Sequence, residues 1–309
     1  MSLMAAGVVL AAVGLDRVVG EPPARLHPVV WVGRLVGPLD RSWPAPRLVG
    51  AVGALCLPLL AAAVVALGVG LAGDIEPLAG GVVAALVLFS AVSLRLLCTT
   101  AGDVLEQTET DIAGAREALL ALAGRDATDL SAGHVRSAAV ESAAENLSDG
   151  FVAPLAGFAV GSVVASRWLT PVATLAVATA AAAWIKAVNT MDSMVGYRSK
   201  PVGWAAARLD DLVMWLPARL TALALSAAML SPDPLLMGQR WAQTPASPNA
   251  GWPMATLAAG LGVRLEKPDH YTLNSVASLP TTTEGHRGVA LVGRAGWLAA
   301  LTTAVIVGV

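Results

Sequence analysis

The sequence predicts an all-α integral membrane protein, a polytopic transmembrane bundle of about 6–8 membrane helices. The chain of 309 residues is 56% hydrophobic and only 14% charged, whereas ordinary globular proteins have about 25% charged residues. Several long segments have no charged residue at all, and about 20 apolar residues are enough for a helix to cross a bilayer. Strands are not expected in lipid, because an open sheet edge leaves backbone groups there without hydrogen bonds.

The uncharged segments indicate where the membrane helices lie. The longest lies between Arg47 and Asp74 and has 26 residues. The N-terminal segment has no basic leader and no clear cleavage site, so we expect it to be a retained first helix. The whole chain, 1–309, is expected to form a single integral membrane domain. The other uncharged runs are 77–94, 150–166, 168–185, 220–232 and 295–309.

Three polar stretches interrupt the apolar runs, at roughly 16–47, 100–150 and 189–211. The second holds ten acidic residues and three arginines, and we expect it to be a partly helical loop region. Lysine and arginine concentrate in the cytoplasmic loops of membrane proteins. An external N-terminus satisfies this rule, with the turns at 73–76 and 166–169 also outside. We therefore expect the three polar stretches, and any active site in them, on the cytoplasmic side of the cell membrane.

Net charge and known motifs exclude several classes. A formal net charge of −2 gives no reason to expect a nucleic-acid partner, which normally requires a basic surface. Cys56 and Cys98 lie in apolar stretches and predict buried side chains rather than a disulfide framework or a metal site. The sequence has no G-x-x-x-x-G-K-[ST] phosphate loop and no H-E-x-x-H motif, so a nucleotide would be bound by another arrangement.

An acidic pattern ends the second polar stretch. Glu141, Glu145 and Asp149 recur every four residues, so on a helix they share one face, and Asn146 adjoins it. Like charges at this spacing repel one another unless a cation lies among them. A divalent metal, a lysine or arginine from another segment, or a substrate would supply that cation. The alternative is a solvent-exposed acidic helix face.

The third polar stretch places acids, amides and cations at the ends of two expected membrane helices. Charged groups at membrane depth are costly and usually functional, and carboxylates such as those of Asp192 and Asp211 suit Mg²⁺. Helix capping and arginines that extend to the membrane surface are the alternative explanation. The residues concerned are Asn189, Asp192, Ser193, Arg198, Lys200, Arg208, Asp210, Asp211 and Arg219.

Two further segments contain polar candidates. The first polar stretch holds His27 and Arg34 among prolines that favour an ordered loop. A lone histidine is more often structural than catalytic. The segment SPNAGWP at 247–253, which contains Asn249, is dense in turn-forming residues. Its alternative role is a simple connection between helices.

Taken together, four segments resemble the CobD/CbiB family of cobalamin-biosynthesis membrane proteins, the adenosylcobinamide-phosphate synthases. The first two are LDRVVGEPPARLHPVVWVGRL and AAVESAAENLSDGFVAPL. The others are NTMDSMVGYRSKPVGWAAARLDDLVMWLPARLTAL and SPNAGWPMATLAAGLGVRL. They follow the family's order and span roughly residues 15–265, and the similarity is looser beyond that point.

The resemblance implies an ATP- and Mg²⁺-dependent amide ligase. It would join the propionate carboxylate of adenosylcobyric acid, a corrinoid, to the amine of (R)-1-amino-2-propanol or of its O-phosphate, aminopropanol phosphate. The product would be adenosylcobinamide or its phosphate. ATP has to activate the acid, because a carboxylate and an ammonium do not condense favourably in water. Other enzymes of the cobalamin pathway are candidate partners.

The polar residues are compatible with this chemistry. The amine must lose a proton, and the candidate general bases are Glu141, Glu145, Asp149 and His27. The candidate ligands of Mg²⁺ are Asp192, Asp210 and Asp211. Phosphates and substrate would be bound by amides, hydroxyls and cations, arginine offering a bidentate fork. These residues are Asn146, Asn189, Ser193, Arg198, Lys200, Arg208, Arg219, Asn249 and Arg34.

Two other functions remain open at this point, a membrane transporter and a non-catalytic binding or regulatory relative. A transporter often has a paired inverted repeat, and the sequence shows none. The side of the membrane on which 231–253 lies is also open. If 212–230 crosses the bilayer fully, 247–253 lies opposite the other motifs. A site that uses this segment requires 212–230 or 251–263 to be a broken or re-entrant helix, which Pro217 and Pro253 favour.

Overall fold

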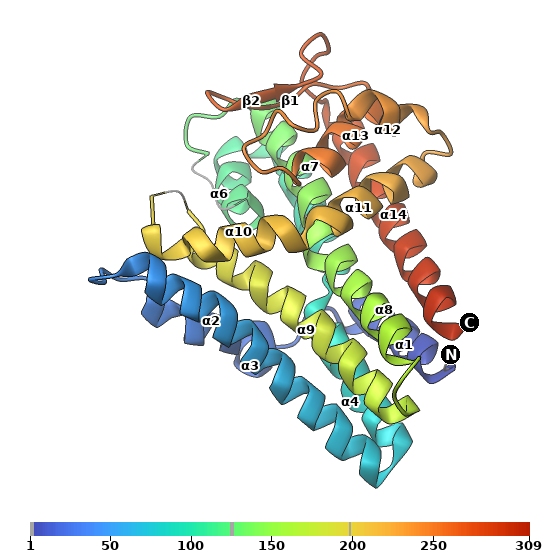
Figure 1. Ribbon diagram of the computed structural model, residues 1–309. Helices are drawn as coiled ribbons and strands as arrows, with labels where there is room; N and C mark the ends of the chain where they lie inside the picture. Colours follow the sequence, from blue (N-terminus) through green and yellow to red (C-terminus); the bar gives the residue numbers. More distant parts are fainter. Residues whose placement is uncertain (1–2, 124–126, 198) are drawn as a thin grey trace. The chain divides into compact units, whose positions relative to one another are not determined.

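The structure is a computed structural model that describes residues 3–123, 127–197 and 199–309. It confirms the all-α class, with helices throughout and one short β-hairpin in the described part of the chain (Figure 1). The chain divides into two compact units. Unit 1 comprises Met1–Ser93, Asp149–Met214 and Ala300–Val309, and unit 2 comprises Leu94–Ser148 and Trp215–Ala299.

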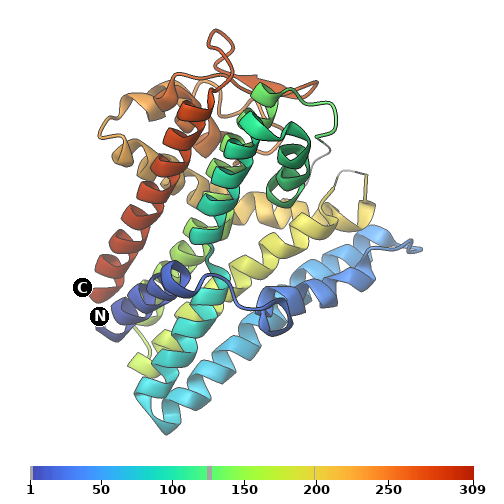
Figure 2. The ribbon, with the colours of Figure 1, turned by 180° about the vertical axis from the view of Figure 1, so that it is seen from behind.

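Unit 1 is built from long apolar helices, of which α3, α4, α8 and α9 run alongside one another (Figures 1 and 2). Four of its helices begin at a proline, whose fixed φ suits the first helical turn and whose missing N–H costs nothing there. The 3-10 turns Ala24–Leu26, Gly37–Leu39 and Pro201–Gly203 lie between successive helices. The helices are α1 (Leu3–Val19), α2 (Pro28–Val36), α3 (Pro46–Ile75), α4 (Pro77–Ala91), α8 (Ala153–Ala165), α9 (Pro171–Val195) and α10 (Trp204–Val213).

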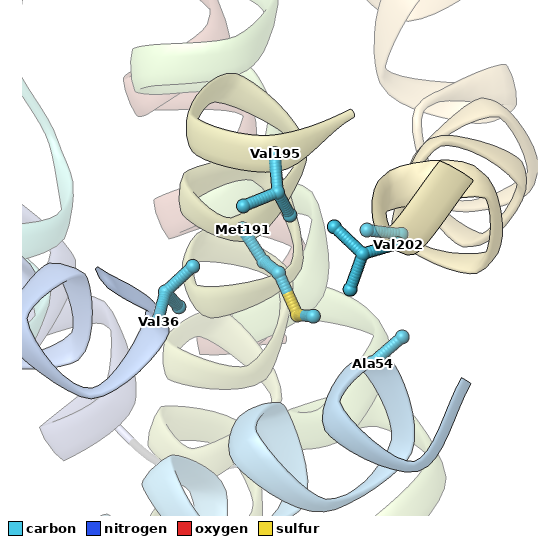
Figure 3. Close-up of a cluster of buried hydrophobic side chains, with 6 residues drawn as sticks. Val36, Ala54, Met191, Val195 and Val202 are labelled. Carbon is cyan, nitrogen blue, oxygen red and sulfur yellow. The ribbon is translucent and has the colours of Figure 1, made fainter. Parts of the chain in front are cut away.

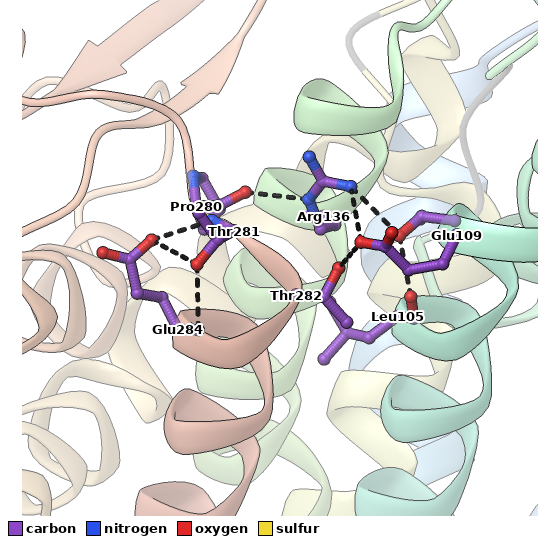
Figure 4. Close-up of polar contacts among 8 residues, drawn as sticks. Leu105, Glu109, Arg136, Pro280, Thr281, Thr282 and Glu284 are labelled. Atoms are coloured by element: carbon purple, nitrogen blue, oxygen red, sulfur yellow. Dashed lines mark hydrogen bonds and ion pairs between the residues drawn. The ribbon is translucent and has the colours of Figure 1, made fainter.

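Unit 2 contains the hairpin, several shorter helices and most of the 27-residue helix α14, whose last residues, Ala300–Gly308, belong to unit 1. Arg136 connects several of them, because its guanidinium donates to the Pro280 carbonyl oxygen at 2.8 Å and pairs with Glu109 at 3.8 Å (Figure 4). The elements are α5 (Arg95–Thr110), α6 (Ile112–Ala123), α7 (Ala132–Leu147), α11 (Trp215–Ala228), α12 (Asp233–Gly238), α13 (Gly251–Leu261), β1 (Leu265–Lys267), β2 (Tyr271–Leu273) and α14 (Thr282–Gly308).

The hairpin differs from the expectation of a chain without strands. Strands β1 and β2 pair antiparallel, with Leu265 opposite Leu273. Asp269 takes a left-handed φ of 62° in the connecting turn, a conformation that aspartate tolerates better than most residues. The argument against strands applies to lipid, and this hairpin lies outside the candidate membrane spans.

Five helical stretches are long and apolar enough to cross a membrane, by length and composition, among the described residues. The pair Pro201–Val213 and Trp215–Ala228 makes a sixth if it is one broken span, which meets the lower end of the expected 6–8. The expected loop at 100–150 is mostly helical, and α7 continues into α8 as one candidate span. The five are Pro46–Ile75, Pro77–Thr110, Ala132–Ala165, Pro171–Val195 and Thr282–Gly308.

A buried apolar cluster fixes the end of α9 against α2, α3 and the turn before α10. Its members include Val36, Met191, Val195 and Val202 (Figure 3). The backbones approach closely here, since a Cβ on Gly203 would lie 1.7 Å from the Val195 carbonyl oxygen. This packing holds the polar residues of α9 and α10 in place.

Candidate active site

Four carboxylates gather in unit 1, and we call them the acid cluster: Asp149, Asp192, Asp210 and Asp211. The Asp210 carboxylate interacts electrostatically with the other three and lies within hydrogen-bonding reach of the Asn189 side chain. Asp192 also interacts with Asp211. Oδ1 of Asp210 is buried and has no hydrogen-bond partner among the described residues. The acid cluster therefore has a buried acceptor atom open to a ligand.

Local backbone geometry positions these acids. Asn189 and Asp192 are three residues apart on α9 and so share a face. Asp149 lies in a π-helical turn, Ser148–Val152, between α7 and α8, and such turns often occur at functional sites. After α9, the Asp192 carboxylate lies against Gly196, where an added Cβ would be 1.8 Å from Oδ1.

Lys186 is a half-buried cation beside the acid cluster. Its ammonium interacts with the carboxylates of Asp149 and Glu21. Sequence reasoning missed this residue, because Lys186 was read only as the end of the uncharged run 168–185. The available signal was a lysine inside a membrane helix, which is costly and usually functional.

His27 lies next to this group, at the start of α2. Its Nδ1 accepts a hydrogen bond from the Val29 amide at 3.3 Å and so caps the helix. Its Nε2 is 3.7 Å from Glu21. Burial lowers the pKa of His27, Glu21 opposes that shift, and Lys186 adds to it. The imidazole is therefore neutral near pH 7 and has a structural role, in addition to its predicted role as a base.

The acid cluster and its neighbours draw on all three polar stretches. Glu21 and His27 belong to the first, Asp149 ends the second, and Asn189, Asp192, Asp210 and Asp211 belong to the third. The first and third stretches also meet at Lys200, whose ammonium is 2.7 Å from Asp40.

The remaining candidates in unit 1 are arranged as follows. Arg208 pairs with Asp211 at 3.5 Å and is largely exposed. The Ser193 hydroxyl donates to the Asn189 carbonyl oxygen, and Arg34 is exposed on α2. Arg198 lies outside the described residues.

In unit 2, the predicted base Glu141 is buried in a hydrogen-bonded group. It accepts from the Ser137 hydroxyl and from the Tyr271 phenol, each at 2.7 Å. Glu145 is half-buried on the same helix. The Asn146 side chain donates to the Leu122 carbonyl oxygen at 3.3 Å.

Arg219 and Asn249 also lie in unit 2 and contact each other. The guanidinium donates to Asn249 Oδ1 at 2.6 Å and lies over the rings of Trp215 and Trp252, 4.7 and 4.8 Å from their centroids. The helix before this arginine is broken between α10 and α11. A site that uses 247–253 requires a break of this kind, and such a site stays a prediction.

In the part of the chain that the structure describes, the acid cluster offers carboxylates to Mg²⁺ but not a complete set of ligands. No group of three or more His, Cys, Asp or Glu side chains forms a ready metal site among the described residues. Mg²⁺, however, is usually bound by one or two carboxylates together with waters and substrate phosphates. Asp192 and Asp210, with the orphaned Oδ1 atom, fit that kind of site.

Long apolar helices with a group of acids among them define an all-α polytopic membrane protein. The family model for "CobD/Cbib protein" matches residues 9–297. A "Probable cobalamin biosynthesis protein CobD" of Methanothrix thermoacetophila is 34% identical over 97% of this chain and 96% of its own length. The chain belongs to the CobD/CbiB family and has a role in cobalamin biosynthesis.

Two bacterial relatives, both named "Cobalamin biosynthesis protein CobD", support this assignment. That of Rhodobacter capsulatus is 37% identical over 94% of this chain and 93% of its own length. That of Klebsiella pneumoniae is 38% identical over 83% of this chain and 81% of its own length. No solved structure matches the chain.

Proposed function

We propose that this protein is an ATP- and Mg²⁺-dependent ligase of cobalamin biosynthesis, an adenosylcobinamide-phosphate synthase. It joins adenosylcobyric acid to (R)-1-amino-2-propanol or its O-phosphate through an amide bond. The enzyme acts in the cell membrane, with its active site on the cytoplasmic side. Family membership supports the pathway, and the acid cluster supports the chemistry.

One observation carries the proposal: acids from three separate segments converge in unit 1, with the half-buried Lys186 beside them. Carboxylates outnumber cations here, so the site favours a positively charged ligand. Both Mg²⁺ and the ammonium of an amino alcohol meet that requirement. The carboxylates are Glu21, Asp149, Asp192, Asp210 and Asp211, and the cations are Lys186 and Arg208.

The reaction balances in two steps. A carboxylate oxygen of the corrinoid attacks the γ-phosphorus of ATP, which forms an acyl phosphate and releases ADP. The amine nitrogen then attacks the acyl carbon, the carbon–oxygen bond breaks, and inorganic phosphate leaves. Mg²⁺, when bound, neutralises phosphoryl charge in the first step.

The residues have distinct roles in this scheme. Asp192 and Asp210 hold the metal. Asp149 binds the ammonium and accepts its proton, and the Lys186 ammonium is a neighbouring cation that interacts with the Asp149 carboxylate. Arg208, exposed at the edge of the acid cluster, binds phosphate. Glu141 with Tyr271, and Arg219 with Asn249, form separate polar groups in unit 2, and they have no assigned role in this scheme.

The test is a complete reaction with the detergent-purified protein. Adenosylcobyric acid, aminopropanol phosphate, ATP and Mg²⁺ are incubated with it, and mass spectrometry follows the corrinoid. We expect the amide adduct, with one ADP released per adduct, and no adduct when ATP is omitted. Corrinoid binding without any ATP-dependent adduct would contradict the ligase and favour a binding or transport protein.

A further inference from the structure

A polar cavity in unit 2 is lined by none of the residues assigned to the proposed active site. It has a volume of about 440 Å³ and lies among the loop after α11 and helices α12, α13 and α14. Its charged lining residues are Arg287 and Arg294 of α14 and Asp233 of α12. The cavity wall therefore has a net positive charge.

The two arginines suit an anion with several oxygens. They are seven residues apart, two helical turns, and so lie on one face of α14. Neither forms a hydrogen bond or an ion pair with any residue in 3–123, 127–197 or 199–309. Guanidinium groups that have no partner within the protein match the oxygens of a phosphate, which they bind through two parallel hydrogen bonds.

The position of the pair along α14 indicates the source of such a phosphate. Thr282–Gly308 is a candidate membrane span, and Arg294 is its last charged residue before the uncharged run 295–309. Trp297 follows one turn later and is 39% exposed, as is typical of an indole at a membrane surface. Basic pockets at this depth bind lipid head groups.

The loop on the other side of the cavity also presents an apolar side chain. Leu230 has a left-handed φ of 57°, which is unusual for a residue other than glycine, and its side chain is 94% exposed. Its amide donates to the Ala227 carbonyl oxygen at 3.0 Å, and the Ser226 hydroxyl bonds the Ser231 carbonyl oxygen. The turn is thus held so that a leucine projects beside the cationic cavity.

We propose that this cavity binds the phosphate head group of an anionic membrane phospholipid. Arg287 and Arg294 bind the phosphate, and Leu230 and Trp297 contact the acyl region. Asp233 weakens the attraction and limits it to ligands that reach both arginines. This site goes beyond the proposed ligase activity and does not depend on it.

The test is native mass spectrometry of the full-length, detergent-solubilised protein with added lipid. The probes are palmitoyl-oleoyl phosphatidylglycerol, palmitoyl-oleoyl phosphatidylcholine and soluble glycerol phosphate. We expect the wild type to bind phosphatidylglycerol in preference to phosphatidylcholine and to glycerol phosphate. Each cation near a membrane surface strengthens binding to anionic lipid by about fivefold. The preference of the Arg287→Gln/Arg294→Gln variant for phosphatidylglycerol should therefore be about 25-fold lower than that of the wild type. Arg240→Gln, an exposed arginine of the same unit outside the cavity, should change nothing.

The Asp233→Asn variant tests the proposal independently of the arginine variants, because it should bind phosphatidylglycerol more tightly than the wild type. Removal of the one acid in the cavity wall should strengthen phosphatidylglycerol binding by about fivefold. Equal lipid preference in wild type and the double-arginine variant would overturn the proposal. Binding of glycerol phosphate as tight as that of phosphatidylglycerol would also overturn it, since the site would then recognise a soluble phosphate.

Discussion

The Arg219 guanidinium donates a 2.6 Å hydrogen bond to Oδ1 of Asn249 and so attaches the segment 247–253 to helix α11. A second donation, to the Trp215 carbonyl oxygen at 2.9 Å, holds the same side chain against its own helix. Asn249 is only 4% exposed, so water cannot replace the arginine. The SPNAGWP segment is therefore an ordered part of unit 2 rather than a free connection.

Arg219→Ala should destabilise the protein by leaving the Asn249 oxygen buried and without this donor. An unsatisfied buried acceptor costs about 1–3 kcal/mol, and the indoles of Trp215 and Trp252 lose the cation between them. Thermal unfolding in detergent measures the effect. Arg240→Ala, at an exposed position, is the control, and an equal midpoint for the two variants would contradict the anchoring role.

Gly196→Ala should reduce ligase activity while the fold is retained. The backbone φ of −69° at this position suits any residue, but the new Cβ would displace the Asp192 carboxylate, which lies 1.8 Å from it. Displacement of a site group by about 1 Å can cost about 100-fold in rate. Steady-state amide formation gives the rate, and circular dichroism the fold.

Alanine variants of two other glycines distinguish the loss of ligase activity in Gly196→Ala from a general loss of stability. Gly203→Ala should unfold the protein at a much lower temperature, because its Cβ would meet the backbone oxygen of Val195 at 1.7 Å. Gly14→Ala faces open space and should leave both properties unchanged. Full activity in Gly196→Ala would argue against a role for Asp192.

His27 should make stability pH-dependent below neutrality. Burial lowers its pKa in the folded state below the usual 6.5, with Glu21 raising it and Lys186 lowering it. As the pH falls through 6.5, the unfolded chain takes up the proton first, so stability is complete above about pH 7 and is lost as the pH falls towards the folded pKa. His27→Asn keeps a capping oxygen and removes this titration.

Thermal midpoints between pH 8 and pH 5 test the prediction. The midpoint of the wild type should fall more steeply than that of His27→Asn, whereas His270→Asn, at an exposed position, should follow the wild type. Parallel curves for wild type and His27→Asn would show that His27 is not buried as the structure has it.

Lys186 and Asp149 should be energetically coupled. Lys186→Met leaves the half-buried Asp149 carboxylate without this cation, which should cost less than the about 3–5 kcal/mol of a fully buried pair. The additional change Asp149→Asn should restore part of that loss. A double-mutant cycle should give a coupling of about 0.5–3 kcal/mol, and additive effects would mean that the two groups do not interact.

Much of the fold could be predicted because lipid imposes a simple rule on composition. The uncharged run between Arg47 and Asp74 forms helix α3, which continues to Ile75, so that Glu76 alone joins it to α4 where a turn at 73–76 is expected. The hairpin at 265–273 was missed because the argument against strands concerned lipid and was applied to the whole chain. The acidic residues of 100–150 favour a partly helical loop, whereas the structure has mostly helix there, in α5, α6 and α7.

The candidate site was only partly predictable, since spacing indicates which residues share a helix face and not which helices meet. The convergence of Asp149, Asp192 and Asp210 depends on packing between α8, α9 and α10. The mutual hydrogen bond of Arg219 and Asn249 likewise joins segments 30 residues apart. Lys186 is visible in the sequence as a charge within an expected membrane helix. An argument from the uncharged run 168–185 alone leaves it out, because that run ends one residue earlier.

The central claim is that the acid cluster is the Mg²⁺- and ATP-dependent site of amide formation. Its most direct test is the rate of adenosylcobinamide phosphate formation by Asp192→Asn and Asp210→Asn across a Mg²⁺ titration, beside Asp74→Asn at an exposed position. Each site variant should lose about 10- to 100-fold in rate or in Mg²⁺ affinity, and Asp74→Asn should match the wild type. Wild-type rates and Mg²⁺ dependence in both correctly inserted site variants would contradict the account.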